Sequence, residues 1–170
     1  MTPKSFIQKF KPAALQAQRI TGLHYLISLA QAALEGGWGE HAPGNNHFGV
    51  KDSDGVNGNE QLLTTTEYSK SKTLKFPQII SIVWDNTKKL WKYRVKDWFR
   101  KYEDGSEIFI EHANFFKTRP RYAKAWAVRN DPNKFFEEIS KAGYATAPDY
   151  SKMLKDISKL IQNTEKIYTL

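Results

Sequence analysis

The hydrophobic pattern of this chain changes period twice along its 170 residues, and this limits the folds that it can adopt. Apolar residues recur at helical spacing within residues 22–35 and again near the C-terminus. Between these segments, Trp91, Tyr93 and Val95 alternate with basic residues, which is the two-residue repeat of a β-strand. The pattern predicts a mostly helical α+β fold that contains a small antiparallel β-lobe at about residues 61–99.

Capping residues and prolines indicate where the helices begin and end. Thr2 followed by Pro3 predicts the start of a first helix that reaches Arg19, because a threonine side chain caps free backbone N–H groups. Gly36 predicts the end of the second helix, 22–35. The other predicted elements are strands at 62–68 and 79–84, a helix between Asp131-Pro132 and Gly143, and a last helix with an apolar stripe of Tyr150, Met153, Leu154, Ile157, Leu160 and Ile161. No repeat or linker divides the chain, which predicts a single domain over residues 1–170.

One acidic residue, Glu35, ends the otherwise uncharged helical segment and is followed directly by Gly36, Gly37 and Trp38. We expect apolar helix on one side of its carboxyl group and a sharp turn on the other. Partial desolvation of this kind favours the neutral form of a carboxyl group, which is the form that a general acid needs near neutral pH. The alternative interpretation is a solvated residue in the last helical turn, and the local pattern does not decide between the two.

Five motifs, in order along the chain, resemble those of the glucosaminidase-type peptidoglycan hydrolases, glycoside hydrolase family 73, which includes flagellar muramidase-like enzymes and autolysins. The motifs are AQAALEGGWG (residues 30–39), NNHFGVK (45–51), TTTEY (64–68), FRKY leading into Gly105-Ser106 (99–106) and AGYATAP (142–148). Because the five lie in the family's order, the match is far more specific than one short pattern. The resemblance implies a lysozyme-like helical body and a β-lobe that flank a glycan cleft.

The resemblance also implies roles for individual residues. Glu35 matches the family's general acid, and Glu67 falls where several members place a second carboxylate on the β-lobe. Tyr144 matches a tyrosine that lines the cleft beside the acid. The chain departs from the family in two ways: Ala147 stands where the family has an acid, and residues 69–97 are longer than the usual hairpin.

Two of these candidates have simpler interpretations. An exposed strand residue paired with a nearby lysine is the alternative for Glu67. Tyr144 can be a packing residue that follows a helix-ending glycine. If Glu67 lies elsewhere, the acetamido group of the substrate can replace the second carboxylate.

Four further residues are candidates for substrate binding: Trp38, Asn46, Phe48 and Tyr122. For Trp38, a ring in the core behind the turn is the first interpretation and a platform for a sugar is the second. Asn46 lies in a Gly-Asn-Asn loop, where asparagine commonly caps its own backbone. With no cysteine, and no histidine pair at the spacing of a metal-binding helix, the sequence predicts neither a metal nor a cofactor.

The net charge is +8, and one segment concentrates it: seven basic residues and one acid lie between Lys88 and Lys101, interleaved with Trp91, Tyr93 and Trp98. Three interpretations stand in this order: the solvated face of a strand, a surface that holds anionic wall polymers, and a nucleic-acid site. We expect no nucleic-acid partner.

No apolar segment approaches the ~20 residues needed to span a bilayer, and the N-terminus lacks the apolar core of a secretory signal. We expect a monomer that acts on the glycan strands of peptidoglycan in the cell envelope or outside the cell, by an export route that the chain does not show. The leading prediction is an endo-β-N-acetylglucosaminidase. The alternatives are a muramidase or lytic transglycosylase on the same fold, and a catalytically silent wall-binding module.

Overall fold

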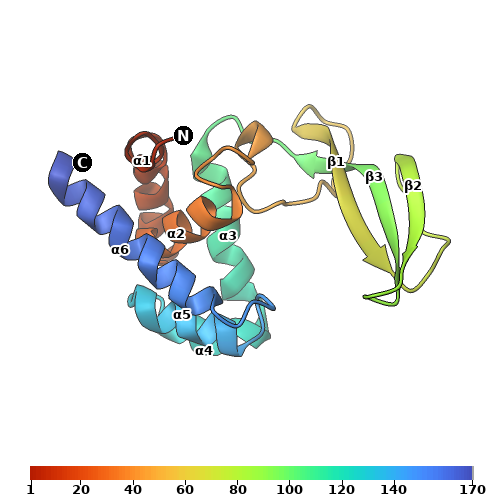
Figure 1. Ribbon diagram of the computed structural model, residues 1–170. Helices are drawn as coiled ribbons and strands as arrows, with labels where there is room; N and C mark the ends of the chain where they lie inside the picture. Colours follow the sequence, from red (N-terminus) through yellow and green to blue (C-terminus); the bar gives the residue numbers. More distant parts are fainter. Residues whose placement is uncertain (170) are drawn as a thin grey trace. The chain divides into compact units, whose positions relative to one another are not determined.

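The computed structural model describes residues 1–169, which divide into two compact units (Figure 1). The helical unit combines Met1–Phe48 with the chain from Tyr102 onward, and the sheet unit consists of Gly49–Lys101. In the sequence, the sheet unit is therefore an insertion between two parts of the helical unit. The predicted α+β fold is confirmed, because one unit is helical and the other contains a three-stranded antiparallel sheet.

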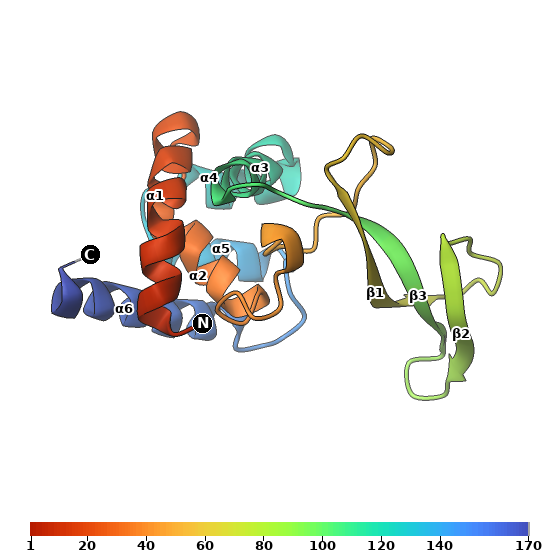
Figure 2. The ribbon, with the colours of Figure 1, turned by 90° about the horizontal axis from the view of Figure 1, so that it is seen from above.

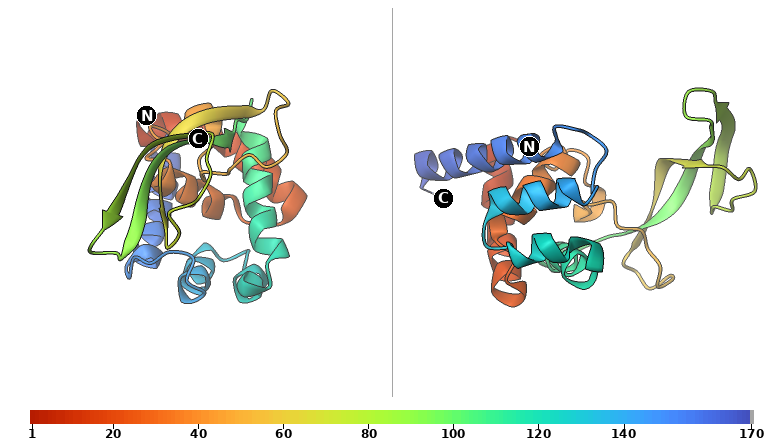
Figure 3. Two further views of the ribbon diagram at one scale, coloured as in Figure 1. Left: turned by 90° about the vertical axis from the view of Figure 1, so that its right-hand side faces the viewer. Right: turned by 90° about the horizontal axis from the view of Figure 1, so that it is seen from below.

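The helical unit is built from α-helices and short 3-10 turns. The helices are α1 (Pro3–Thr21), α2 (Tyr25–Glu35), α3 (Gly105–Thr118), α4 (Ala123–Ala127), α5 (Pro132–Lys141) and α6 (Tyr150–Tyr168), and the turns are η1 (Pro43–Asn45) and η2 (Pro120–Tyr122). Thr2 and Asp131 cap α1 and α5 as predicted, because each side chain accepts a hydrogen bond from a backbone N–H of the first turn. α6 packs beside α5 and also contacts α1 and α2 (Figure 3).

α2 is the most enclosed helix of this unit. The consecutive residues from Leu26 to Ala33 are all buried, and α1, α3, α5 and α6 each contact the helix. A helix that is apolar on every side is stable only when other elements surround it. The C-terminal end of α2, where Glu35 lies, is therefore held by the core of the unit.

Glycines precede and follow α2 for different reasons. Gly22 has a φ of 84° and ends α1, so the second helix begins at Tyr25 and not at Gly22 as predicted. Gly36 ends α2 as predicted, but its φ is −89°, which other residues also adopt. The need for glycine is steric, because a Cβ atom there would lie 2.9 Å from both the Ala32 carbonyl oxygen and Nδ1 of His47.

The sheet unit contains β1 (Glu60–Ser69), β2 (Gln78–Asp85) and β3 (Leu90–Arg100). β3 lies in the middle, antiparallel to both neighbours, in the order β1-β3-β2 (Figure 2). The predicted alternation is present, because Tyr93, Val95 and Phe99 are buried whereas Lys92 and Arg94 are exposed. β3 thus has one covered face and one exposed face.

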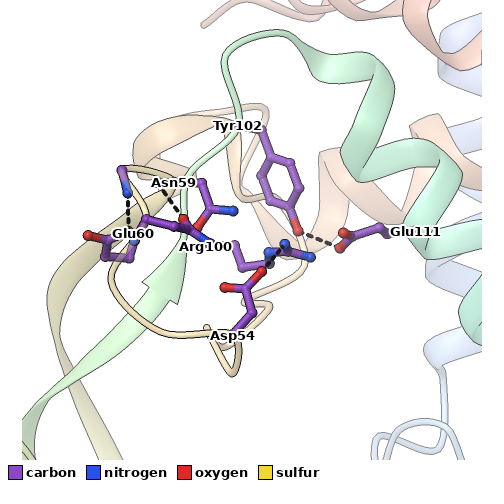
Figure 4. A network of polar contacts seen from close by, with 8 residues as sticks. Asp54, Asn59, Glu60, Arg100, Tyr102 and Glu111 are labelled. Atoms are coloured by element: carbon purple, nitrogen blue, oxygen red, sulfur yellow. Dashed lines mark hydrogen bonds and ion pairs between the residues drawn. The ribbon is translucent and has the colours of Figure 1, made fainter.

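Each unit closes on itself where the chain passes from one to the other. In the sheet unit, the Arg100 N–H donates to the Val50 carbonyl at 3.0 Å, and the Arg100 side chain pairs with Asp54 at 2.9 Å (Figure 4). In the helical unit, the Tyr102 N–H donates to the Gly44 carbonyl at 2.8 Å. A backbone hydrogen bond therefore joins the two ends of the sheet unit. Another joins the two segments of the helical unit between which the sheet unit is inserted.

Within residues 1–169, no helix has the length and apolar character needed to cross a membrane. The same residues contain no group of three or more histidine, aspartate or glutamate side chains placed to hold a metal ion.

Two buried histidines lie in the aromatic part of the helical core. The His47 ring meets the Phe10 ring nearly at right angles with 4.5 Å between centroids, and the His112 ring stacks on Phe48 at 4.0 Å. Burial lowers the pKa of His47 to about 4, with a further contribution from the charge of Lys9, and burial lowers the pKa of His112 to about 3. Both rings are therefore neutral in the folded protein at a pH where unfolded histidines take up protons.

We predict that the free energy of unfolding falls as the pH is lowered from about 6.5 toward about 4. In this window the unfolded chain binds protons on both buried histidines and the folded chain does not, so acid favours unfolding. For His47, a pKa of about 4 in the folded chain against about 6.5 in the unfolded chain corresponds to about 3 kcal/mol. Urea unfolding at neutral and at acidic pH measures the loss.

The variant His47→Gln should start less stable than the unmodified protein but lose less stability on acidification. His41→Gln is the matched control, because His41 is exposed, and it should lose as much as the unmodified protein. Equal losses in His47→Gln and the unmodified protein would contradict the prediction.

Candidate active site

Glu35 is the last residue of α2, and its side chain is exposed. The side chain is thus more exposed than the sequence predicts, although its hydrogen bond to Tyr150 is partly buried. One carboxylate oxygen nevertheless has a fixed partner, since the Tyr150 hydroxyl donates a hydrogen bond to Oε1 at 2.9 Å. The site is thus an exposed carboxylate at the end of a buried helix, oriented by a phenol.

Tyr150 and Gln31 hold this carboxylate from the side of the core. Tyr150 is the first residue of α6 and is 4% exposed, while Gln31 lies on α2 one turn before Glu35 and is fully buried. The Gln31 side-chain amide donates a hydrogen bond to the Tyr150 oxygen at 3.1 Å. Burial, and next the charge of Glu35, raise the pKa of Tyr150 above its usual value. The phenol therefore acts as a neutral donor to Glu35.

Sequence reasoning misses both of these residues. It places Tyr150 in the apolar stripe of the last helix, where the ring does pack. An apolar stripe does not predict a hydrogen bond from the hydroxyl group. The available signal is Gln31, a polar residue four positions before Glu35 in an apolar helix. Residues at this spacing share one face of a helix, so Gln31 indicates the face of α2 on which Glu35 has a polar neighbour.

Tyr144 follows Gly143, whose φ of 73° turns the chain after α5. The Tyr144 N–H donates to the Ile139 carbonyl at 3.0 Å, and its ring centroid lies 5.7 Å from that of Tyr150. Burial raises the pKa of Tyr144, and the charge of Glu35 is the next largest cause of the increase. Tyr144 and Glu35 therefore lie in the same part of the helical unit, while a contact of Tyr144 with substrate stays a prediction.

The four residues predicted to bind substrate lie in the helical unit, and three of them pack against other aromatic rings. Trp38 is half-buried, with its ring edge-on to Phe6 at 5.5 Å. The half-buried Phe48 ring stacks on a histidine ring. Asn46 and Tyr122 are each 5% exposed, which leaves little of either side chain for a ligand. Their role in substrate binding stays a prediction.

In the sheet unit, Glu67 lies on β1 opposite Tyr93 of β3. The Lys51 ammonium donates to Glu67 at 2.7 Å and also pairs with Asp97. Burial acts to lower the pKa of Lys51, but the hydrogen bonds to Asp97 and Glu67 outweigh it and raise the pKa above its usual value. Such a lysine partner agrees with the alternative interpretation of Glu67 as a strand residue paired with a nearby lysine. Because Glu35 and Glu67 belong to different units, their pairing across a cleft stays a prediction.

A second tyrosine–glutamate pair ties the same two helices together away from Glu35. The Tyr25 hydroxyl at the start of α2 donates to Glu165 of α6 at 3.0 Å, and Lys11 also pairs with Glu165 at 3.0 Å. α2 and α6 are therefore joined by a phenol–carboxylate hydrogen bond at each end of α2.

Comparison with known proteins identifies relatives of the whole chain. The model of the glucosaminidase family, described as mannosyl-glycoprotein endo-beta-N-acetylglucosaminidase, matches residues 11–163. The peptidoglycan hydrolase FlgJ of Vibrio parahaemolyticus is 30% identical over 168 residues, which cover 95% of this chain and 48% of that protein. FlgJ of Escherichia coli K12 is 30% identical over 179 residues, which cover 98% of this chain and 50% of that protein. The chain thus spans about half the length of these relatives.

A solved structure covers the same region. The glycoside hydrolase domain of Salmonella typhimurium FlgJ superposes with a TM-score of 0.73 at 26% sequence identity, over 99% of this chain and 94% of that chain. The two chains therefore share a fold along almost their whole length.

We predict that Tyr150→Phe lowers the free energy of unfolding by about 1–2 kcal/mol, because the buried Gln31 amide loses a hydrogen-bond acceptor. Tyr25→Phe is the matched control, since it also removes a phenol–carboxylate bond between α2 and α6 but at a half-buried side chain, and it should cost less. Urea denaturation compares the two variants with the unmodified protein. Unchanged stability in Tyr150→Phe would contradict the role of the network.

Proposed function

Because the chain belongs to the glucosaminidase family, as its motifs indicate, we propose that it is a peptidoglycan hydrolase that acts as an endo-β-N-acetylglucosaminidase. Its substrate would be the β-1,4 bond between N-acetylglucosamine and N-acetylmuramic acid in the glycan strands of the cell envelope. The observation that carries the proposal is the Glu35 carboxylate, exposed at the end of buried α2 and oriented by Tyr150. An exposed acid on an immobile support suits a polymeric substrate.

In the proposed reaction, Glu35 is the general acid. Its carboxyl proton passes to the oxygen that links the two sugars, while the bond from that oxygen to the anomeric carbon breaks. A water molecule then supplies the new hydroxyl group at the anomeric carbon and gives up the proton that restores the acid. Tyr150 engages Oε1, which leaves Oε2 to carry the proton toward the substrate. Gln31 acts indirectly, as a positioning residue, because its amide holds the Tyr150 hydroxyl in place.

Tyr144 supplies a second polar group beside the acid in this proposal. Its phenol remains neutral because burial and the nearby charge of Glu35 raise its pKa. A neutral phenol can donate a hydrogen bond to the acetamido group of the sugar, or its oxygen can steady positive charge on the ring. Both interactions matter most in the transition state, so they would raise the rate more than the affinity.

A second group is needed on the opposite side of the sugar. Glu67 is the candidate from the sequence, and Asp97, which shares the Lys51 ammonium with it, is a candidate from the structure. Lys51 orients both carboxylates, so either one would be presented in a fixed position. The acetamido group of the substrate is the remaining candidate, because some glycosidases use it in place of a carboxylate.

The products of digestion test which bond is cut. Mass spectrometry of muropeptides released by the proposed activity should show N-acetylglucosamine at the new reducing ends. N-acetylmuramic acid at the reducing ends would assign a muramidase instead, and anhydro-muramic ends would assign a lytic transglycosylase. Intact glycan strands after prolonged digestion would favour a silent wall-binding module.

We predict that Glu35→Gln lowers the rate of wall lysis by about 10²–10⁴-fold, because the glutamine amide has no acidic proton to transfer to the leaving group. The fold should be unchanged, since the side chain is exposed. Turbidity of purified wall fragments measures lysis, and thermal unfolding measures the fold. Glu40→Gln, at an exposed acid that pairs with the N-terminal amine, is the control and should lyse normally. Lysis near the unmodified rate by a folded Glu35→Gln protein would remove Glu35 from this role.

We predict that Glu67→Gln lowers kcat by about 10²-fold or more and changes KM little, because a second carboxylate acts in the transition state. Asp97→Asn is the matched control, since it removes the other partner of Lys51 and should lower kcat less than about tenfold. Steady-state kinetics on soluble glycan fragments compares the two. The reverse order would transfer the role to Asp97, and normal rates in both would transfer it to the acetamido group.

A further inference from the structure

One face of the sheet carries a row of cations that the proposed reaction does not use. Lys92, Arg94 and Lys96 alternate with the buried residues of β3, so all three lie on the same side of the sheet. Lys92 and Arg94 are exposed, and Lys96 is partly exposed. Glu67 is paired with Tyr93 and therefore lies on the other face. The row is thus separate from the carboxylates proposed for catalysis.

The neighbouring strands place no charged residue directly opposite this row. The residues paired with it are Tyr68, Thr66 and Thr64 on β1 and Val83, Ser81 and Gln78 on β2, all of them uncharged. The acids on the same face, Glu60 and Asp85, stand at strand ends and accept hydrogen bonds from backbone N–H groups of the adjoining turns. In the part of the chain that the structure describes, no salt bridge joins Arg94 or Lys96 to a carboxylate, and Lys92 has only a longer-range attraction to Asp85, which contributes to the lowered pKa of that carboxyl group.

We propose that this face, the Lys92–Lys96 row, binds a linear phosphodiester polymer of the bacterial cell wall. The choice of polymer rests on the proposed function, because in many bacterial walls phosphodiester polymers are attached to the peptidoglycan that such a hydrolase would cut. Alternate residues of a strand are about 7 Å apart, so the row presents regularly spaced positive charges to an extended chain that carries one charge in each repeat. The hydroxyl groups of Thr64, Thr66 and Ser81 flank the row and can bond the hydroxyl groups of a polyol or sugar repeat.

The aromatic residues of this face favour a polymer without bases. Proteins that bind single-stranded nucleic acid stack successive bases on exposed rings along a basic groove. Here the Lys88 ammonium lies 3.7 Å from the centre of the Tyr68 ring and covers it. Trp98 is 36% exposed and lies beyond the end of the row. Between Lys92 and Lys96 the neighbours are hydroxyl and aliphatic groups, which give bases no ring to stack on.

The test uses the full chain and soluble poly(glycerol phosphate) as the probe. The variant Lys92→Gln/Arg94→Gln/Lys96→Gln removes the row, and Arg94→Gln alone serves if the triple variant does not fold. The matched control Lys117→Gln/Lys124→Gln/Lys159→Gln removes the same charge from exposed positions of the helical unit. Affinity is measured over a range of salt concentrations, together with an oligothymidylate that has the same number of phosphates.

We expect the row variant to weaken binding of the polymer at least about tenfold and to reduce the slope of log affinity against log salt by about 2, as for the loss of three phosphate contacts. The control variant should bind like the unmodified protein, and the oligothymidylate should bind more weakly than the polymer. Unchanged binding by the row variant, an equal loss in the control, or tighter binding of the oligothymidylate would overturn the proposal.

The same proteins separate this proposal from the proposed function. On wall fragments from which hydrofluoric acid has removed the phosphodiester polymer, the row variant should cleave glycan strands at the unmodified rate. On untreated fragments it should be slower than the control variant. Absence of cleavage by the unmodified protein would contradict the proposed hydrolase and leave the binding result intact. Equal rates of both variants on untreated fragments would count against the row as a wall-binding face.

Discussion

The enclosure of α2 is the constraint on which the helical unit depends. Its residues from Leu26 to Ala33 are buried on all sides, so α1, α3, α5 and α6 must pack around it and their order in space follows. The same enclosure fixes where Glu35 stands, because a residue at the end of a surrounded helix cannot shift without disturbing the core. Two phenol–carboxylate bonds between α2 and α6, Tyr150 to Glu35 and Tyr25 to Glu165, hold the two ends of this helix.

Much of the fold can be predicted from periodicity, because helical and strand spacing each need only local sequence. The β-lobe, the caps at Thr2 and Asp131 and the end of α2 at Gly36 all follow from such patterns. The start of α2 does not, because Gly22 serves the preceding helix and local sequence does not say which helix a glycine ends. The exposure of the Glu35 side chain is also not predicted, because burial depends on segments that are distant in the sequence.

The candidate site is less accessible to sequence reasoning than the fold, because its contacts join distant segments. Tyr150 lies 115 positions from Glu35, and an apolar stripe records its ring but not its hydroxyl. Lys51 reaches Glu67 from 16 positions away, and no local pattern connects a loop lysine with a strand carboxylate. Only the resemblance to the family points to Tyr144. Local sequence therefore indicates one part of the site, the acid before two glycines. The other contacts of the site become visible only in the tertiary structure.

The way in which each unit closes on itself has a consequence for how such proteins diversify. The sheet unit joins its own ends through Arg100 and Val50, and the helical unit joins the two sides of its gap through Tyr102 and Gly44. Neither closure depends on how many residues lie between. Hairpins of the sheet can therefore lengthen, shorten or be exchanged during evolution while selection on the helical core stays unchanged. Segment 69–97, which is longer than the resemblance to the family implies, fits such a change, in which an inserted lobe is altered and the acid-bearing helical core is kept.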